Sequence, residues 1–304
     1  MLKKKIKNIL KSGLNRLPYV KTLHRLSLNS RFPAGHFYSS VVSLDDIRKR
    51  QDQIWPSDLP QIIPGIDLRR KEQLELLSEL SKFYIDLPFP ENKNKEFRYF
   101  LNNPYFSYGD GLILYFMIRH YEPKKIIEIG SGFSSALMLD TNECFFGGEI
   151  ELIFVEPYPE TRLLQLMNKK EEKVQLIAEE IQGIPLHIFK TFEPGDILFV
   201  DSSHIIKTGS DVQFILNKIL PILKKGVLIH IHDIHFPFEY PKDWVLDGFG
   251  WNEVYYIQAF LMYNEGFKII MFNDYLSKVN PEALVSMPLM AKATGSSLWL
   301  EKTI

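Results

Sequence analysis

Three short clusters in this sequence combine residue types that can do chemistry, and each follows an apolar run. They span residues 128–132, 201–204 and 230–233. Glycines in the first cluster let main-chain amides approach a ligand. Neighbouring carboxylates and imidazoles in the other two can transfer protons or hold a cation. The clusters therefore predict a ligand-binding turn beside a site of acid–base chemistry.

The first cluster is a turn of the kind that binds nucleotides. A β-branched strand ends near Glu128, and Gly130, Ser131 and Gly132 then lead into a helix. There the main-chain N–H groups and the partial positive charge of the helix end can meet a ligand. A dinucleotide site would have a third glycine where Ser135 stands, and a phosphate loop would need Gly-Lys-Ser/Thr. The turn thus predicts a nucleoside ligand, and its class remains open at this point.

A carboxylate ends the second strand of the same unit. Glu156 follows the apolar run 150–155 and lies 24 residues after Gly132. An acid at this place points into the crevice at the carboxyl edge of a parallel sheet and can accept hydrogen bonds from both ribose hydroxyls. NAD enzymes use the same device, so Glu156 supports nucleoside binding without choosing a class. The alternative is a solvated acid at a strand end.

The second cluster pairs a carboxylate with an imidazole. Asp201 follows the run 196–200, and His204 stands three residues later. Asp201 could contact a ligand ammonium group or a metal ion. His204 is the predicted general base, because its unperturbed pKa of ~6.5 is easily tuned to neutrality. The alternative is that His204 merely caps a turn.

The third cluster follows the next strand. Asp233 stands at its carboxyl end with His232 just before it, so both are predicted to reach the crevice, whereas His230 lies deeper and is predicted to be a core residue. Asp201 and Asp233 would then end neighbouring strands and could hold Mg²⁺, which prefers oxygen ligands. A transition metal, or a metal-free site with His204 or His232 as the base, are the alternatives, and we leave the metal open.

Alternating strands and helices predict an α/β fold from about residue 105. Its sheet would be Rossmann-like, mostly parallel and covered on both faces. The last two strands have no clear helix between them, which predicts an antiparallel C-terminal hairpin. The expected strands are 125–129, 150–155, 174–178, 196–200, 227–232, 267–272 and 296–301, and the expected helices are 110–120, 134–141, 160–168, 184–191, 210–223 and 252–264.

Residues 1–100 are predicted to be a largely helical N-terminal extension of a domain that spans 101–304. Within the extension, residues 1–17 have the apolar spacing of an amphipathic helix. Residues 1–44 contain nine Lys or Arg and no Asp or Glu. This basic helix could dock on an anionic membrane surface or on a partner, or it could pack on its own domain.

Composition narrows the class of protein. A net charge of −1 argues against binding of the whole chain to nucleic acid. The single cysteine, Cys144, excludes an internal disulfide and a multi-thiolate zinc site, and it suits a reducing cytoplasm. No apolar run reaches the roughly 18 residues that span a bilayer. The expected location is the cytoplasm, with peripheral association at the inner membrane surface as an option.

Further motifs stand in order along the chain and together resemble one family. They occupy residues 103–106, 128–135, 199–204, 207–211, 230–234 and 251–253. In this combination they are similar to bacterial class I S-adenosylmethionine (SAM)-dependent methyltransferases, of the group called methyltransferase family 24. The resemblance covers roughly residues 30–304.

The resemblance implies SAM as the methyl donor, bound by Glu128, Gly130, Gly132 and Glu156 with Asp201 beside it. Ser131 belongs to the same turn. Related metal-dependent O-methyltransferases have acids at the ends of the fourth and fifth strands, and they add Asn or Asp after the second acid. Ile234 stands in that place here, which argues against a bound metal.

The predicted function is methyl transfer to a small-molecule or sugar acceptor, on oxygen. Deprotonation of that oxygen would fall to His204, His232 or Asp233. The aromatic segment 236–251 could form a lid over the acceptor or could simply pack. One alternative is an NAD-dependent oxidoreductase, which Ser135 and the terminal hairpin disfavour. Another is a non-catalytic scaffold that keeps the nucleoside pocket.

Overall fold

The computed structural model of the chain describes residues 13, 17, 18, 20, 22, 30–167 and 174–304. The basic helix expected over 1–17 therefore lies almost wholly outside the described residues. By its contacts the chain forms two units, the first made of 1–57 with 242–250 and the second of 58–241 with 251–304. Residues 58–100, assigned above to the N-terminal extension, belong to the second unit, as do all the candidate site residues.

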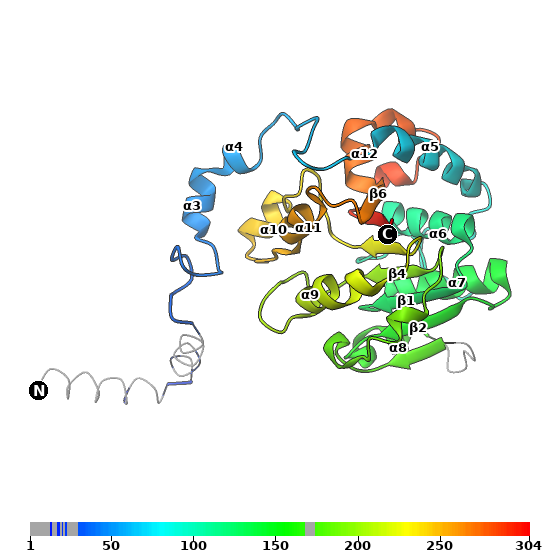
Figure 1. Ribbon diagram of the computed structural model, residues 1–304, viewed down its shortest axis with the longest axis horizontal. Helices are drawn as coiled ribbons and strands as arrows, with labels where there is room; N and C mark the ends of the chain where they lie inside the picture. Colours follow the sequence, from blue (N-terminus) through cyan, green and yellow to red (C-terminus); the bar gives the residue numbers. More distant parts are fainter. Residues whose placement is uncertain (1–12, 14–16, 19, 21, 23–29, 168–173) are drawn as a thin grey trace, which may run out of the picture. The chain divides into compact units, whose positions relative to one another are not determined.

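The second unit is built on a seven-stranded sheet in the order β3-β2-β1-β4-β5-β7-β6 (Figure 1). β7 runs antiparallel to both of its neighbours, and the other pairs are parallel. This confirms the predicted mostly parallel sheet with an antiparallel C-terminal pair. The strands are β1 (Lys125–Ile129), β2 (Glu151–Val155), β3 (Val174–Ile177), β4 (Ile197–Val200), β5 (Leu228–Ile231), β6 (Phe267–Phe272) and β7 (Leu298–Lys302).

Helices accompany nearly every strand. In the second unit the α-helices are α5 (Arg70–Leu80), α6 (Tyr108–Tyr121), α7 (Phe133–Phe146), α8 (Leu163–Leu166), α9 (Asp211–Phe214), α11 (Glu253–Leu261) and α12 (Asn273–Val279). Its shorter helical turns are η1 (Ser81–Tyr84), η2 (Pro159–Thr161), η3 (Ile181–Gly183), η4 (Phe189–Thr191), η5 (Ile215–Ile219), η6 (Leu220–Ile222), η7 (Pro281–Leu284) and η8 (Met290–Lys292). The first unit contains α3 (Leu44–Lys49), α4 (Gln51–Ile54) and α10 (Lys242–Leu246).

The core lies on both sides of the central strands. All residues of β4 and β5 are buried, as an apolar run without alternation predicts for a parallel strand covered on both faces. α6 is buried over 11 consecutive residues, 108–118, so it is an interior helix rather than an amphipathic one. Gly111 lets the Tyr99 side chain pack directly on α6, because a Cβ there would lie 1.9 Å from the Tyr99 hydroxyl oxygen.

Three expectations about helices need correction. α12 occupies the connection between β6 and β7, where no helix was expected; its Asp274 accepts hydrogen bonds from the Phe236 amide and from Lys278 Nζ. The helix expected over 184–191 is only 3-10 turns, since Pro185 disfavours helical geometry at Ile184. The segment 160–168 is likewise short, with η2 followed by α8.

Helix 210–223 forms as predicted, but its geometry changes along its length. α9 continues into the π-helical η5 and then the 3-10 turn η6, which contains Pro221. Proline has no N–H to donate to the preceding turn, so the hydrogen bonds around it are rearranged.

The aromatic segment after β5 divides between the two units. Phe236, Phe238 and Tyr240 are buried in the second unit, and the two phenylalanines pack against Phe272. Packing, rather than a lid, accounts for these three rings. The residues 242–250 belong to the first unit.

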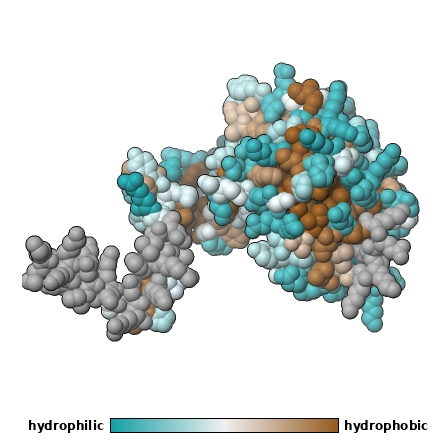
Figure 2. All heavy atoms as spheres, turned by 60° about the horizontal axis from the view of Figure 1, so that its bottom comes forward, coloured by the Kyte–Doolittle hydropathy of each residue, from teal (hydrophilic) through white to brown (hydrophobic). Residues whose placement is uncertain are grey.

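The surface of the second unit is mixed. On the face shown in Figure 2, apolar side chains gather in a brown patch bordered by hydrophilic ones. Within the described part of the chain, none of the helices has both the length and the apolar character needed to span a bilayer.

Candidate active site

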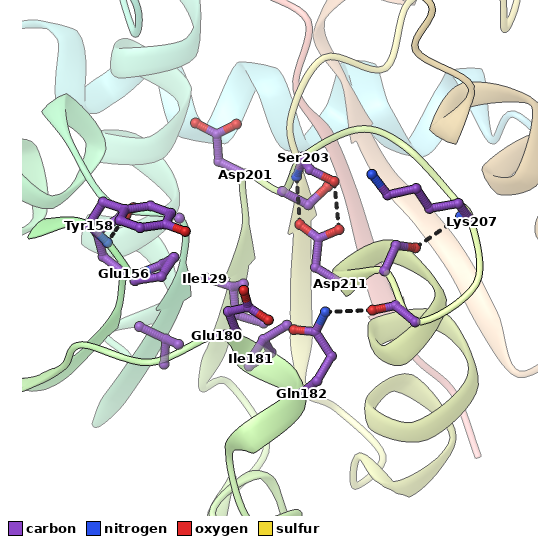
Figure 3. A pocket seen from close by; sticks show the side chains of 16 residues that line it. Ile129, Glu156, Tyr158, Glu180, Ile181, Gln182, Asp201, Ser203, Lys207 and Asp211 are labelled. Carbon is purple, nitrogen blue, oxygen red and sulfur yellow. Dashed lines mark hydrogen bonds between the residues drawn. The ribbon is translucent and has the colours of Figure 1, made fainter. Parts of the chain in front are cut away.

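A cavity of about 460 Å³ opens at the carboxyl edge of the sheet (Figure 3). It is lined by the segments that follow β1, β2, β3 and β4, where a parallel sheet collects its functional loops. Glu156 and Tyr158 lie on one side in Figure 3, and Asp201 and Lys207 come from the segment after β4. The remaining lining residues used below are Gly130, Glu180, Gln182, Ser203, Gly209 and Asp211.

Gly130 is required by the fold itself. Its φ is +81°, and a Cβ there would lie 1.9 Å from the carbonyl oxygen of Asp201. Gly132 is less constrained, because its φ of −178° is ordinary extended backbone. A Cβ at Gly132 would lie 3.0 Å from Cδ of Arg162, which is a flexible neighbour.

Glu128 anchors the turn from beneath. It is fully buried and accepts hydrogen bonds from the hydroxyls of Ser134 and Ser135 at the start of α7. Burial raises the pKa of Glu128 to about 8, despite these hydrogen bonds. Glu128 does not line the cavity, so its structural role is to hold the turn against α7.

Ser135 explains why a third glycine is not needed. Its hydroxyl oxygen accepts a hydrogen bond from the Gly132 amide at 2.9 Å and donates to Glu128. The serine therefore caps the first turn of α7. The residue that spoils the dinucleotide fingerprint is thus a structural part of this turn.

Glu156 is hydrogen-bonded to the glycine turn. One carboxylate oxygen accepts from the Ser131 amide at 3.1 Å, and the other accepts from the Tyr158 amide at 2.8 Å. Ser131 takes part through its main chain. The carboxylate lines the cavity with lone pairs to spare, as a ribose-binding acid would.

His204 lies among three carboxylates. Its Nδ1 is 2.9 Å from Glu253 Oε2, and its Nε2 is 3.3 Å from Asp201 Oδ1 and 3.6 Å from Asp233 Oδ2. The ring is buried, and the residue has a left-handed φ of +58°. The second and third clusters of the sequence are therefore brought together around one imidazole.

These charges set the protonation of the group. Burial alone would lower the pKa of His204, but hydrogen bonds with Asp201 and Glu253, and their charges, raise it to about 10. Burial also opposes ionisation of Asp201, yet His232 and His204 hold its pKa below the ordinary value. At neutral pH His204 carries its proton, so this arrangement does not favour its predicted role as a general base.

Asp233 is held at the end of β5 in a left-handed conformation, with φ of +56°. It accepts a hydrogen bond from Ser296 Oγ at 2.8 Å, and its Oδ1 lies 3.7 Å from His232 Nε2. Burial would lower the pKa of His232, but Asp233, Asp201 and Asp110 together raise it. His232 and Asp233 therefore lie beside each other at the end of β5, and neither is among the residues that line the cavity.

His230 is a core residue, as expected. It is fully buried, its Nε2 lies 2.8 Å from Ser297 Oγ, and its ring stacks on Phe199 at 3.8 Å. Burial lowers the pKa of His230 far enough to keep the ring neutral.

Two further buried acids hold the site in place, one from α11 and one from α6. Glu253, at the start of α11, bonds both His204 and the Ser202 hydroxyl. Asp110, in α6, accepts from the amides of Ser296 and Ser297 and so fixes the segment that holds Asp233. The sequence placed Glu253 in the motif 251–253 but gave no sign of its contact with His204.

Two further contacts shape the cavity. Gln182 Nε2 donates to the Gly209 carbonyl at 2.8 Å, which ties the turn after β3 to the loop before α9. Asp211 accepts from the amide and hydroxyl of Ser203 at 2.7 and 2.6 Å. Figure 3 shows both pairs as dashed lines. Spacing alone did not single out Gln182 or Asp211.

Arg162 lies over the glycine turn. Its guanidinium carbon is 3.7 Å from the centre of the Tyr105 ring, and its side chain covers Gly132. Its charge also helps to lower the pKa of Asp201. Among the residues that the structure describes, no carboxylate forms an ion pair with Arg162.

The residues present do not fit a metal ion between Asp201 and Asp233. His204 Nε2 faces both carboxylates, and Ile234 is buried where a further oxygen ligand would be needed. Over residues 30–167 and 174–304, no group of three or more His, Cys, Asp or Glu is arranged to hold a metal.

The strand order and the glycine turn define a methyltransferase-type α/β domain. A family model described as a methyltransferase domain matches residues 127–234 of the chain. A protein of Archaeoglobus fulgidus, named only as uncharacterized, is 37% identical over 167 residues, which is 53% of this chain and 74% of that relative.

Solved structures with a similar fold include two methyltransferases. The SAH-bound methyltransferase PaMTH1 of Podospora anserina has a TM-score of 0.43 and 14% identity, covering 90% of this chain and 99% of that one. The O-methyltransferase TomG of Streptomyces achromogenes, in complex with SAM, has a TM-score of 0.40 and 16% identity, covering 76% and 90%. Similarity at this level carries no argument about ligand or substrate.

Proposed function

We propose that this protein is a SAM-dependent methyltransferase that acts on an oxygen atom of a small-molecule or sugar acceptor. The match of residues 127–234 to the methyltransferase domain model supports the reaction class. The observation that carries the choice of SAM is the charge of the cavity next to the glycine turn.

Carboxylates dominate the described lining of this cavity. Glu156, Glu180, Asp201 and Asp211 contribute four acids, against one cation, Lys207. SAM carries a sulfonium and an ammonium group, whereas NAD carries a pyrophosphate anion. An acidic, partly enclosed site attracts the first and repels the second. This favours SAM over the NAD-dependent alternative.

The chain offers a group for each part of SAM. Glu156, already fixed by two amides, would accept from the ribose hydroxyls. Asp201 would face the ammonium group. Arg162, which has no carboxylate partner among the described residues, would pair with the methionine carboxylate above Gly132.

SAM supplies a methyl group on a sulfonium carbon, which already has a good leaving group. The protein's own contribution is alignment of the acceptor oxygen, exclusion of water and removal of its proton. Asp233, at the end of β5, would receive that proton, and His232 beside it at 3.7 Å would stabilise the ionised carboxylate. Protonated His204 would position Asp201 and Asp233 instead of acting as the base.

Calorimetric titration with SAM, S-adenosylhomocysteine and NAD tests the choice of ligand. We expect SAM and its product to bind and NAD not to bind. Glu156→Gln should weaken SAM binding about tenfold or more, since one charge-assisted acceptor is lost. Glu160→Gln, an exposed acid nearby in η2, is the matched control. Tighter binding of NAD than of SAM would overturn the proposal.

The acceptor is tested by transfer of a tritiated methyl group to small metabolites and sugars. Label recovered on oxygen, and lost in Asp233→Asn, supports the proposal. Binding of SAM without any labelled product from a cell extract would favour the scaffold alternative.

Docking through the basic N-terminal segment is a further part of the proposal. It rests on the nine Lys or Arg and no acid in residues 1–44. Co-sedimentation of the full chain with anionic vesicles tests it. Charge reversal of Lys3, Lys4 and Lys5 to Glu should reduce binding, because each basic residue near an anionic surface contributes about 1 kcal/mol.

A further inference from the structure

The imidazole of His204 has a carboxylate oxygen in front of each ring nitrogen. Nδ1 faces Glu253 at 2.9 Å, and Nε2 faces Asp201 at 3.3 Å. Ionised carboxylates only accept hydrogen bonds, so both ring nitrogens must donate. A ring with two N–H donors is an imidazolium, and His204 is therefore a cation by geometry.

This cation lies at the place that joins the ends of β4 and β5. Asp201 follows β4 and Asp233 stands at the end of β5, and Nε2 of His204 lies 3.3 Å from the first and 3.6 Å from the second. A divalent ion that used both acids would need this same space. Without a cation between them, these two half-buried carboxylates would repel each other.

The imidazolium is rigidly placed. The His204 amide donates to Ser202 Oγ at 3.1 Å, and its carbonyl accepts from the amides of Asn252 and Glu253 at the start of α11. The ring also lies 4.4 Å from that of Trp251. Both the main chain and the ring are thus fixed by α11, and the side chain is not free to leave the two acids.

We propose that His204 is a built-in cation that takes the place of a divalent metal ion between Asp201 and Asp233, so that this site works without a metal. The proposal concerns the cation between two strand ends and does not depend on which acceptor is methylated, nor on SAM as the donor.

The test is to remove the imidazolium and ask whether a metal takes its place. His204→Gly leaves the space open and tolerates the left-handed φ of +58°. Free Mn²⁺ is measured by electron paramagnetic resonance during titration of the full chain. We expect the variant to bind one Mn²⁺ about tenfold or more tightly than the wild type. Adding Asp233→Asn to this variant should remove the gained affinity.

Two results would overturn the proposal. One is tight Mn²⁺ binding by the wild type that Asp233→Asn weakens, which would place the metal site beside an intact His204. The other is a folded His204→Gly protein, with the circular dichroism of the wild type, that gains no Mn²⁺ affinity. If His204→Gly does not fold, the wild type and Asp233→Asn still decide the question. None of these titrations involves methyl transfer, so failure of the proposed function gives a different result.

Discussion

Glu128 shows how a motif residue can serve the fold rather than the ligand. Its carboxyl group lies under the glycine turn and bonds two serines of α7. Glu156, in contrast, is exposed to the cavity and already bonded to the Ser131 and Tyr158 amides. Of these two acids, Glu128 therefore stabilises the turn, whereas Glu156 remains available to a ligand in the cavity.

Glu128→Gln should alter the pH dependence of stability. The pKa of Glu128 is raised from 4.5 to about 8 in the folded chain, chiefly by burial. Its contribution to stability is therefore complete below pH ~4.5 and is lost as the pH rises through about 8. Glutamine resembles the protonated acid. Between pH 5 and 9 the free energy of unfolding of the variant should therefore rise relative to that of the wild type, by at most about 1.4 kcal/mol per pH unit.

Urea unfolding of both proteins across that pH range measures the difference. Glu96→Gln, at an exposed position, controls for the loss of one negative charge. An offset between Glu128→Gln and the wild type that stays constant with pH would contradict the raised pKa.

Arg162→Gln should weaken the binding of ligands that carry a carboxylate. The guanidinium stacks on Tyr105 above Gly132, and a charge-assisted pair is worth roughly 1.5–3 kcal/mol. We expect the Kd for S-adenosylhomocysteine to rise about tenfold or more. Methylthioadenosine, which lacks the amino-acid part, should bind the variant as well as it binds the wild type. Equal losses for both ligands would mean that Arg162 acts only through packing.

At the scale of elements, the ends of β1 and β4 are joined tightly. The Asp201 amide donates to the Ile129 carbonyl at 2.9 Å, and Gly130 leaves room for the Asp201 carbonyl. The glycine turn and residues 201–204 are thus held in fixed positions relative to each other. Likewise α11 and the 201–207 loop are linked, since the Asn252 side chain bonds the Ile206 main chain.

Gly130→Ala and Gly132→Ala should therefore differ sharply in stability. At Gly130 the new methyl group would collide with the Asp201 carbonyl, and φ is +81°, so we expect a loss of about 3 kcal/mol or more. At Gly132 the backbone is extended and the neighbour is the flexible Arg162 side chain, so the loss should stay near 1 kcal/mol. Chemical denaturation measures both, and equal losses would contradict the close approach of β1 and β4.

At the scale of the whole molecule, charge is distributed unevenly. The chain has a net charge of −1, yet residues 1–44 contain nine basic residues and no acid. The described lining of the cavity in the second unit has the opposite character, with four acids and one lysine. The net charge of the whole chain reveals neither the basic segment 1–44 nor the acidic lining of the cavity.

The acidic cavity predicts a salt effect that depends on the ligand. Raising the ionic strength from ~0.05 to ~0.5 M shortens the Debye length from about 14 Å to about 4 Å. SAM carries a net positive charge, whereas S-adenosylhomocysteine is neutral overall. The Kd for SAM should therefore rise more than the Kd for its product. Calorimetry at both salt concentrations measures this, and equal changes would argue against an electrostatic role of the lining.

The sequence by itself determined the parts of this protein that depend on local patterns. Apolar runs located all seven strands to within about two residues, and the glycine turn and Glu156 were paired by their spacing. Such features depend on residues that are close in sequence, so they can be predicted from the sequence alone. The helix α12 was not predicted, because contacts distant in sequence stabilise it. Its Asp274 is hydrogen-bonded to Phe236, which is 38 residues away.

Only the tertiary structure decided what the histidines and acids do. Glu253 reaches His204 from 49 residues away, and Asp110 fixes Ser296 from a distance of 186 residues. These contacts change a predicted base into a buried cation, because a pKa depends on the charges and burial that folding brings together. Residue type gives His204 its capacity to carry a proton, and its neighbours decide whether it keeps that proton.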